Sequence, residues 1–278
     1  MSSQQRARAS GQPPPGGECG PGGGVAAPGM LSHAEEVMGT VVSFTVLPGE
    51  LPVPAARLAI TGACRILHEA DAVFSTWDPG SPVSRLRRGE VRLHDVPAEV
   101  AEVLSLCRVA KQATAGWFDP WALPGGVDPT GLVKGWAVER AAARLRQSGV
   151  AAALVNGGGD LTCFGSPGPG QPWRVGIRHP WRADALACVV NLRAAMATSA
   201  GYERGEHLIN PVTGQPARGV ASATVTGPSL AMADALATAV AAGGDDALAA
   251  VAAVSGYEAY LIRSDGSETD TGGIEFTR

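Results

Sequence analysis

The order of the predicted secondary-structure elements restricts the fold of this chain more than any other feature. Strand-like segments cluster between blocks of helix-like sequence, and strands do not alternate regularly with helices. Parallel strands need a long crossover, usually a helix, between them, so this order favours antiparallel pairing. The sequence therefore predicts an α+β fold with mainly antiparallel sheets and packed helices.

Hydrophobic periodicity predicts the individual segments. Alternating, β-branched residues over 40–46 predict the first strand. Helical spacing of apolar residues predicts helices near 54–72, 98–115, 132–148, 229–242 and 245–255. Further strands are expected at 152–155, 161–164, 173–178, 187–192, 222–226, 257–262 and near 274–277. The stretch from Ser75 to Leu86 contains Asp-Pro-Gly, which predicts a loop.

The N-terminal segment has a different composition from the rest. Gly and Pro supply 13 of the first 30 residues, which leaves too little apolar surface to offset the entropy of ordering. We expect a disordered arm over 1–34 and a single domain over 35–278. The sequence shows no apolar run typical of a signal peptide or a membrane span, which predicts a cytoplasmic protein without a membrane span.

Charge and cysteine spacing argue against two classes of protein. The chain has 22 Lys and Arg against 26 Asp and Glu, with no long run of one sign, so nucleic acid is not an expected partner. Its 5 cysteines are scattered and show no Cys-x-x-Cys spacing. Neither a disulfide framework nor a zinc site is expected, and the cysteines are assigned no catalytic role.

Asp234 and Thr238 lie four residues apart in a run that is otherwise almost all alanine and leucine. A helix would place both oxygens on one face. An unpaired carboxylate there is costly, and a hard cation such as Mg²⁺, which takes carboxylate and hydroxyl oxygens, would offset the cost. The alternative is an exposed aspartate beside a threonine that bonds to its own helix. The spacing leaves both interpretations open.

Two other segments suggest an anionic ligand. Lys134 follows the turn at Asp128 near the start of a helix, where an ammonium and a helix N-terminus can face one anion, although a solvated surface lysine is the alternative. The run from Asn156 to Asp160 contains three glycines between two strands. Its backbone N–H groups could approach a ligand, or it could be a hairpin turn, for which Asn-Gly is a strong signal.

Four further residues are ambiguous from the sequence. Histidine titrates near neutral pH and can transfer protons, but His207 could equally be structural. Trp77 and Trp117 flank turns, where they could stack on a planar ring or cap the core. Met38 precedes the first predicted strand, where methionine usually packs.

In order, these segments resemble the ApbE family, the FAD:protein FMN transferases. The likeness covers about Val37 to the C-terminus. The matching strings are Met38-Gly39-Thr40, Phe74-Ser75-Thr76-Trp77, Ser84-Arg85-Leu86, Gly116-Trp117-Phe118-Asp119-Pro120, Asp128 with Gly131 and Lys134-Gly135, Asn156-Gly157-Gly158-Gly159-Asp160, Thr198-Ser199, His207 to Gly214, and Asp234-Ala235-Leu236-Ala237-Thr238. Each motif is weak alone, and their joint order makes the resemblance specific.

The resemblance implies a T-fold-like α+β architecture and a magnesium-dependent reaction. In that reaction a threonine hydroxyl of an acceptor protein, expected to be a redox flavoprotein subunit, attacks FAD, accepts FMN and releases AMP. The implied metal ligands are Asp234, Thr238 and the carbonyl of Gly131. The implied catalytic residues are Asp234 and the proton acceptor His207. The implied FAD contacts are Met38, Trp77, Trp117, Phe118, Asp119, Asp128, Lys134 and Ile209.

The chain also departs from the family pattern. Arg87 follows the Ser-Arg-Leu string where the family often has Asn, and Asn210 replaces the usual Asp before Pro211. Two alternatives therefore remain open beside the transferase. One is a magnesium-dependent FAD pyrophosphatase that yields FMN and AMP, and the other is a non-catalytic flavin-binding protein.

Overall fold

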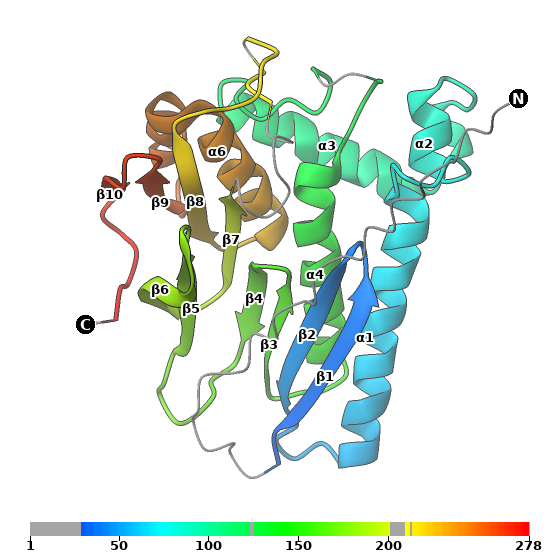
Figure 1. The fold of residues 1–278 in the computed structure, drawn as a ribbon. Helices are drawn as coiled ribbons and strands as arrows, with labels where there is room; N and C mark the ends of the chain where they lie inside the picture. Colours follow the sequence, from blue (N-terminus) through cyan, green and yellow to red (C-terminus); the bar gives the residue numbers. More distant parts are fainter. Residues whose placement is uncertain (1–28, 123–124, 201–208, 212, 278) are drawn as a thin grey trace, which may run out of the picture.

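The fold consists of a large antiparallel sheet, a small β-ribbon and a layer of helices (Figure 1). The computed structural model describes residues 29–122, 125–200, 209–211 and 213–277. All pairs in the eight-stranded sheet are antiparallel, in the order β1 (Leu31–Val37), β2 (Thr40–Leu47), β3 (Ala152–Gly157), β4 (Asp160–Phe164), β7 (Ala195–Ala200), β8 (Val220–Gly227), β9 (Glu258–Arg263) and β10 (Glu268–Asp270). The ribbon pairs β5 (Trp173–His179) with β6 (Arg182–Leu192). The predicted α+β class with antiparallel sheets is confirmed.

Helices cover one face of the large sheet (Figure 1). They are α1 (Val53–Phe74), α2 (Pro82–Arg87), α3 (Ala98–Ala113), α4 (Thr130–Gln147) and α6 (Leu230–Ala252), with a 3₁₀ turn at Leu93–Asp95. The β5–β6 ribbon takes part in a second, smaller core. Strand β9 contributes to both cores. Leu261 belongs to the helix-side core, whereas Tyr260 and Ile262 belong to the second core. Alternate residues of one strand therefore serve both cores.

The helix α6 is buried mainly over 230–242, where its sequence is mostly alanine, leucine and valine. It bends at Gly244, where φ is 57° and ψ is −131°, so the two helices predicted around 242–245 form one kinked element. Its length and hydropathy would also suit a membrane span, and it is the one helix among the described residues of which this is true. Half of its apolar window is buried within the protein, as in the core helix of a folded domain.

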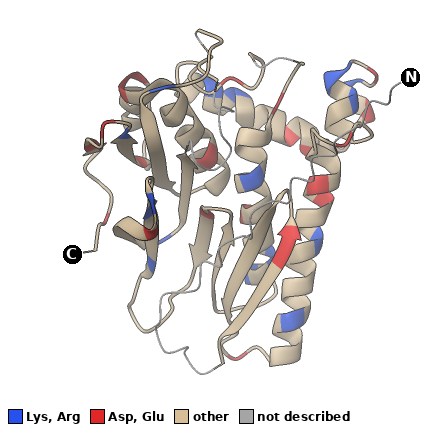
Figure 2. Cartoon of the chain, viewed as in Figure 1, with Lys and Arg blue, Asp and Glu red and all other residues tan. Residues whose placement is uncertain are grey.

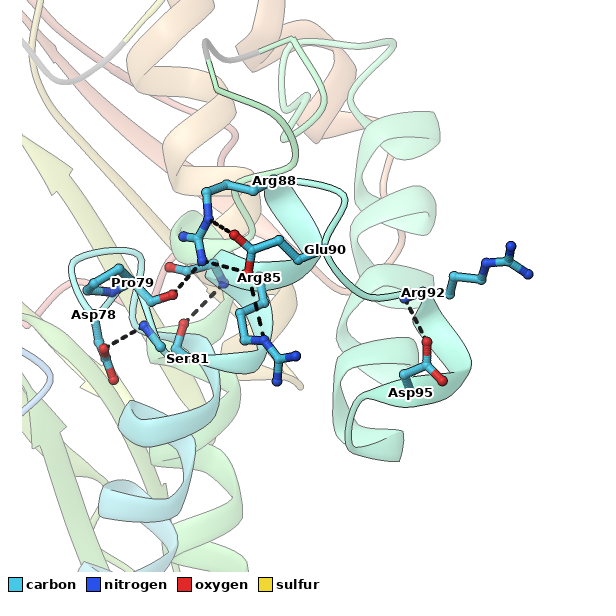
Figure 3. A network of polar contacts seen from close by, with 10 residues as sticks. Asp78, Pro79, Ser81, Arg85, Arg88, Glu90, Arg92 and Asp95 are labelled. Carbon is cyan, nitrogen blue, oxygen red and sulfur yellow. Dashed lines mark hydrogen bonds and ion pairs between the residues drawn. The ribbon is translucent and has the colours of Figure 1, made fainter.

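The predicted end of the loop after α1 is wrong. The segment predicted as a loop from Ser75 ends in α2, which starts at Pro82 and has Ser81 as its N-cap, with the Ser81 hydroxyl accepting from the N–H of Ser84 at 3.0 Å. The preceding turn is fixed to the end of α2 by Arg88, whose guanidinium binds the Pro79 carbonyl at 2.6 Å (Figure 3). Proline at the first helical position after a serine cap is a signal for the start of a helix. The sequence prediction gave more weight to the neighbouring Asp-Pro-Gly turn and assigned a loop.

The strands that periodicity missed lie where side chains are small or polar. Strand β1 includes residues 31–34 of the expected disordered arm and is held by its pairing with β2. Strand β7 has the sequence AMATSA, which lacks the large β-branched residues typical of strands. The strand expected near 274–277 is replaced by β10 and by an isolated bridge between Phe276 and Val190. Basic and acidic residues are interspersed along the ribbon (Figure 2).

Helices α4 and α6 approach each other closely at a glycine. A Cβ atom at Gly135 would lie 2.6 Å from the carbonyl oxygen of Leu230 and 2.9 Å from the Cβ of Asp234, both in α6. Glycine is otherwise unfavourable within a helix, by about 1 kcal/mol relative to alanine. Its presence in α4 therefore reflects the space that α6 requires.

Replacing Gly135 with alanine should destabilise the protein despite the higher helix propensity of alanine. We expect a loss of about 1–3 kcal/mol in the free energy of unfolding, typical of overpacking. Urea unfolding followed by circular dichroism measures it. Gly62→Ala in α1 is the matched control, because its new methyl group would meet only the flexible side chain of Arg144, 3.2 Å away at Nε. Equal midpoints for both variants would contradict the close-packing argument.

Candidate functional site

The buried carboxylate of Asp234 marks the junction of α4 and α6. Asp234 is 5% exposed, and its Oδ2 accepts from the N–H of Gly135 at 2.9 Å. Helix geometry would direct this N–H to the carbonyl of Gly131, so the carboxylate competes for the donor that Gly131 would otherwise use. The alternative of an exposed aspartate is thus wrong. The junction therefore combines the buried carboxylate of Asp234 with the carbonyl of Gly131. The usual hydrogen-bond donor of that carbonyl, the N–H of Gly135, also bonds to Asp234.

Thr238 lies one helical turn beyond Asp234 and meets the first turn of α4. A Cβ at Gly131 would be 3.3 Å from Thr238 Oγ1 and 3.2 Å from the ring of Phe118, so only glycine fits there without displacement. The Thr238 hydroxyl is also 3.4 Å from that of Ser199 in β7. The sequence-predicted residues Gly131, Asp234 and Thr238 therefore come together, with oxygen atoms of three chemical kinds.

The position of α6 on α4 is set by a residue that sequence reasoning missed. Glu139 of α4 accepts hydrogen bonds through Oε2 from the Ser229 hydroxyl at 2.9 Å and from the Ala231 N–H at 3.0 Å. A carboxylate at a helix N-terminus satisfies otherwise unpaired N–H groups and interacts favourably with the helix dipole. Glu139 thereby anchors the start of α6, one turn before Asp234.

Lys134 forms a buried ion pair with Asp160. The distance from Nζ to Asp160 Oδ2 is 2.8 Å, and the two side chains are 14% and 1% exposed. The other oxygen of Asp160 accepts from the N–H of Thr198 in β7 at 3.2 Å. The surface-lysine alternative is wrong, and the pair links α4 to two strands. The aspartate at the end of the glycine run was the available signal in the sequence.

The glycine run itself is a hairpin turn. Gly157 pairs with Asp160, and the two residues between them, Gly158 and Gly159, have φ values of 65° and 97°. The Asn156 side chain accepts from the N–H of Gly159 at 2.9 Å. A two-residue turn with positive φ at both positions matches strand twist and requires residues such as glycine. The hairpin interpretation is therefore confirmed.

Asp128 lies at the start of α4 and is paired with Arg87. Its Oδ1 accepts from the N–H and the hydroxyl of Thr130, at 3.1 and 2.7 Å. Its Oδ2 is 3.2 Å from Arg87 Nη1, and both side chains are largely buried. The departure from the family pattern at position 87 thus places a guanidinium directly on a residue implied to contact FAD.

The aromatic and hydrophobic residues implied to contact FAD have different environments. Phe118 is buried, and Trp117 packs against the core, where a Cβ at Gly243 would be 2.5 Å from its ring. Trp77 is 89% exposed and therefore available for stacking. Met38 forms the β1–β2 turn with a φ of 54° and packs partly against the core.

The other predicted residues stand as follows. Asp119 pairs with Lys111 Nζ at 2.7 Å and accepts from the N–H of Trp121 at 3.0 Å. Ile209 is half-buried and forms a bridge with Pro216. His207 lies outside the described residues, so its role as proton acceptor stays a prediction.

Burial keeps the thiols of Cys107 and Cys163 unreactive. It raises the pKa of the Cys107 thiol to about 12 and that of the Cys163 thiol to about 12. Since the thiolate is the nucleophile, these residues act as small apolar side chains at neutral pH. This agrees with assigning them no catalytic role.

Comparison with known families decides the assignment of this chain. The family model described as ApbE matches residues 38–125 and 122–261. The chain belongs to the ApbE family.

Curated ApbE relatives and solved structures are similar over different extents. A protein named FAD:protein FMN transferase from Klebsiella pneumoniae (strain 342) is 34% identical over 114 residues, which cover 37% of this chain and 33% of that protein. One of the same name from Rhodobacter capsulatus is 37% identical over 109 residues, 36% of this chain and 20% of that protein. The matched segments thus span a third or less of these relatives.

The structural matches cover nearly the whole of the known chains. The ApbE protein of Thermotoga maritima has a TM-score of 0.74 at 23% identity and covers 86% of this chain and 96% of that one. The flavin transferase ApbE of Vibrio cholerae has a TM-score of 0.73 at 21% identity, covering 88% and 97%. At this identity the likeness establishes the fold.

Breaking the ion pair between Lys134 and Asp160 should destabilise this ApbE protein. We expect Lys134→Met to cost about 3–5 kcal/mol of unfolding free energy, because it removes the cation beside a fully buried carboxylate. Chemical denaturation measures the cost. The exposed pair of Arg193 and Glu275 is the matched control. The free energy of unfolding of Arg193→Met should equal that of the wild type within error. A Lys134 variant as stable as this control would show that the pair contributes nothing.

Proposed function

We propose that this ApbE protein is a magnesium-dependent transferase that moves FMN from FAD to a threonine hydroxyl of an acceptor protein and releases AMP. The observation that carries the proposal is the buried carboxylate of Asp234, which contacts Gly135 of α4 and lies one helical turn from Thr238. Relatives in the same family bear the name FAD:protein FMN transferase, which supports this choice of substrate and product.

The junction of α4 and α6 fits a hard divalent cation. A carboxylate, a hydroxyl and a backbone carbonyl are oxygen donors, and Mg²⁺ binds few protein oxygens while keeping positions for water and phosphate. Asp234, Thr238 and the carbonyl of Gly131 would hold the ion. When bound, Mg²⁺ would neutralise charge on the pyrophosphate of FAD.

The residues around the junction would position FAD. Lys134 is held by Asp160 at the α4 side of the junction, where a fixed ammonium can bind a phosphate oxygen. Phe118 packs against Gly131 in the same region. The exposed ring of Trp77 offers a surface for stacking on the planar isoalloxazine or adenine. Met38, Trp117, Asp119, Asp128 and Ile209 complete the proposed set of contacts.

The proposed reaction forms one phosphoester bond and breaks one phosphoanhydride bond. The threonine oxygen attacks the phosphorus on the FMN side of FAD, and the bridging oxygen leaves with AMP. His207 accepts the proton of the threonine hydroxyl. Positioning and charge neutralisation supply most of the rate in phosphoryl transfer, so fixed groups matter more than strongly reactive ones.

In-gel flavin fluorescence tests the transfer. Protein, FAD and Mg²⁺ are incubated with a lysate of the source organism, and a fluorescent band other than the protein itself is expected. Asp234→Asn should reduce the labelling rate by about 100-fold or more, because the loss of a metal ligand removes several kcal/mol of charge stabilisation. Asp246→Asn, an exposed aspartate on the same helix, is the matched control.

The same incubation separates the competing functions. Chromatography of the nucleotides shows whether AMP appears without an acceptor, which would indicate a pyrophosphatase. FAD that binds tightly but stays intact in Mg²⁺ would indicate a flavin-binding protein. Either result without any labelled band would contradict the transferase proposal.

Arg87 should affect FAD binding more than the chemical step. Its guanidinium occupies Oδ2 of Asp128, which is part of the proposed FAD site. We expect Arg87→Asn to change the KM for FAD several-fold while kcat changes less than twofold, because the pair would position FAD and includes none of the proposed metal ligands. Steady-state AMP release measures both constants. Arg85→Asn, on the same helix and largely exposed, is the control. A large fall in kcat alone would show that Arg87 acts on the chemistry instead.

A further inference from the structure

Polar side chains on the inward face of β1 form a cluster that the proposed transferase site does not use. In β1 the residues Leu31, His33, Glu35 and Val37 alternate onto one face, and Leu31 and Val37 belong to or pack against the main core. His33 and Glu35 therefore lie on the helix side of the sheet, between two apolar residues. Their side chains are 40% and 27% exposed, so the cluster lies at the open edge of the sheet.

Helix α1 supplies two more residues to the same place. Cys64 and His68 are four residues apart and thus lie on one face of α1. His68 Nε2 is 2.7 Å from Oε1 of Glu35, and His33 Nε2 is 3.0 Å from Oε2 of the same carboxylate. Ligand atoms of His33, Glu35 and Cys64 all lie within 4.8 Å of one another. Two residues of β1, spaced two apart, thus meet two residues of α1, spaced four apart.

We propose that His33, Glu35 and Cys64 bind a divalent transition metal of the zinc class. Imidazole nitrogen, thiolate sulfur and carboxylate oxygen are the ligands typical of tetrahedral zinc sites. Ligands at about 2.0–2.3 Å from such an ion are about 3.3–3.7 Å from one another, so only small side-chain adjustments are needed. His68 is a positioning residue, because it holds the second oxygen of Glu35 and so orients the carboxylate.

This site differs in chemistry and place from the one proposed at Asp234. Its donors include nitrogen and sulfur, which Mg²⁺ does not select, whereas the junction of α4 and α6 offers only oxygen. Cysteine spacing predicted no zinc site because the ligands are 31 residues apart along the chain and only one is a cysteine. The fold of β1 onto α1 brings them together.

The metal would fasten an edge strand to the helix layer. Among the described strands, β1 lies at the end of the sheet order and is hydrogen-bonded to β2 alone. A bond from β1 to Cys64 through the ion would connect it to α1, which runs beside it (Figure 1). The turn at Met38 and Gly39 follows β1 directly, so the position of this turn would be fixed as well.

Cobalt substitution tests the site in the full, untagged chain. We expect Co²⁺ added to metal-free protein in excess Mg²⁺ to give the visible bands of tetrahedral coordination and a near-ultraviolet thiolate charge-transfer band. Zn²⁺ should abolish both, and one equivalent of zinc should survive dialysis. Cys64→Ser should remove the thiolate band and His33→Gln should lower affinity at least 100-fold. His68→Gln should lower affinity about 10–100-fold, as expected for a residue that orients a ligand.

Controls separate metal binding from general damage to the fold. Cys107→Ser, a buried cysteine in α3, should bind cobalt like the wild type. The side chains of His33 and His68 are 40% and 52% exposed, so their variants should match the metal-free wild type in Tm. Zinc should raise Tm and slow amide exchange over 31–37 in the wild type, and in the His33 variant it should do neither.

Three results would overturn the proposal. The first is the absence of a thiolate-to-cobalt band in the wild type, and the second is a band that persists in Cys64→Ser. The third is zinc retention that is unchanged in His33→Gln, which would place the ion elsewhere. None of these measurements depends on FAD or on an acceptor protein, so a failed transferase assay would leave the metal site standing.

Discussion

The close approach of α4 and α6 is the constraint on which the rest of the site depends. Gly135 lets the backbone of α6 come within contact of α4, and its N–H then reaches the buried carboxylate of Asp234. Gly131 leaves room for Thr238 one turn away. Glu139 fixes the start of α6, so these three α4 residues face consecutive turns of one helix. A charge buried at such a crossing is costly unless it is bound, and this is why we propose the junction as the functional site.

Contacts around the junction join elements that are distant in sequence. Lys134 connects α4 to the β3–β4 hairpin through Asp160, and Asp160 connects the hairpin to β7 through the N–H of Thr198. Thr198 in turn meets Thr224 of β8 at 2.9 Å between hydroxyl oxygens. Each member is held by packing and hydrogen bonds before any ligand arrives. Such preorganisation suits phosphoryl transfer, where fixed charges supply most of the catalysis.

The sequence predicted the fold class and the long elements because hydrophobic periodicity is local. It missed β1 and β7, whose residues become strands only through their partners. It correctly placed Asp234 and Thr238 one turn apart on one helix, because helical spacing is local too. It could not reveal that Lys134 pairs with Asp160 or Arg87 with Asp128, because those contacts depend on tertiary packing. The cluster of His33, Glu35 and Cys64 was hidden for the same reason.

The central claim is that Asp234 and Thr238 hold the metal that acts on FAD. Anomalous diffraction from crystals soaked with FAD and Mn²⁺, a scattering substitute for Mg²⁺, tests it most directly. We expect an anomalous peak bonded to an Asp234 oxygen, the Thr238 hydroxyl and the Gly131 carbonyl, with the FAD pyrophosphate beside it. Bound FAD whose pyrophosphate lies far from Asp234, or a metal peak only at other residues, would contradict the claim.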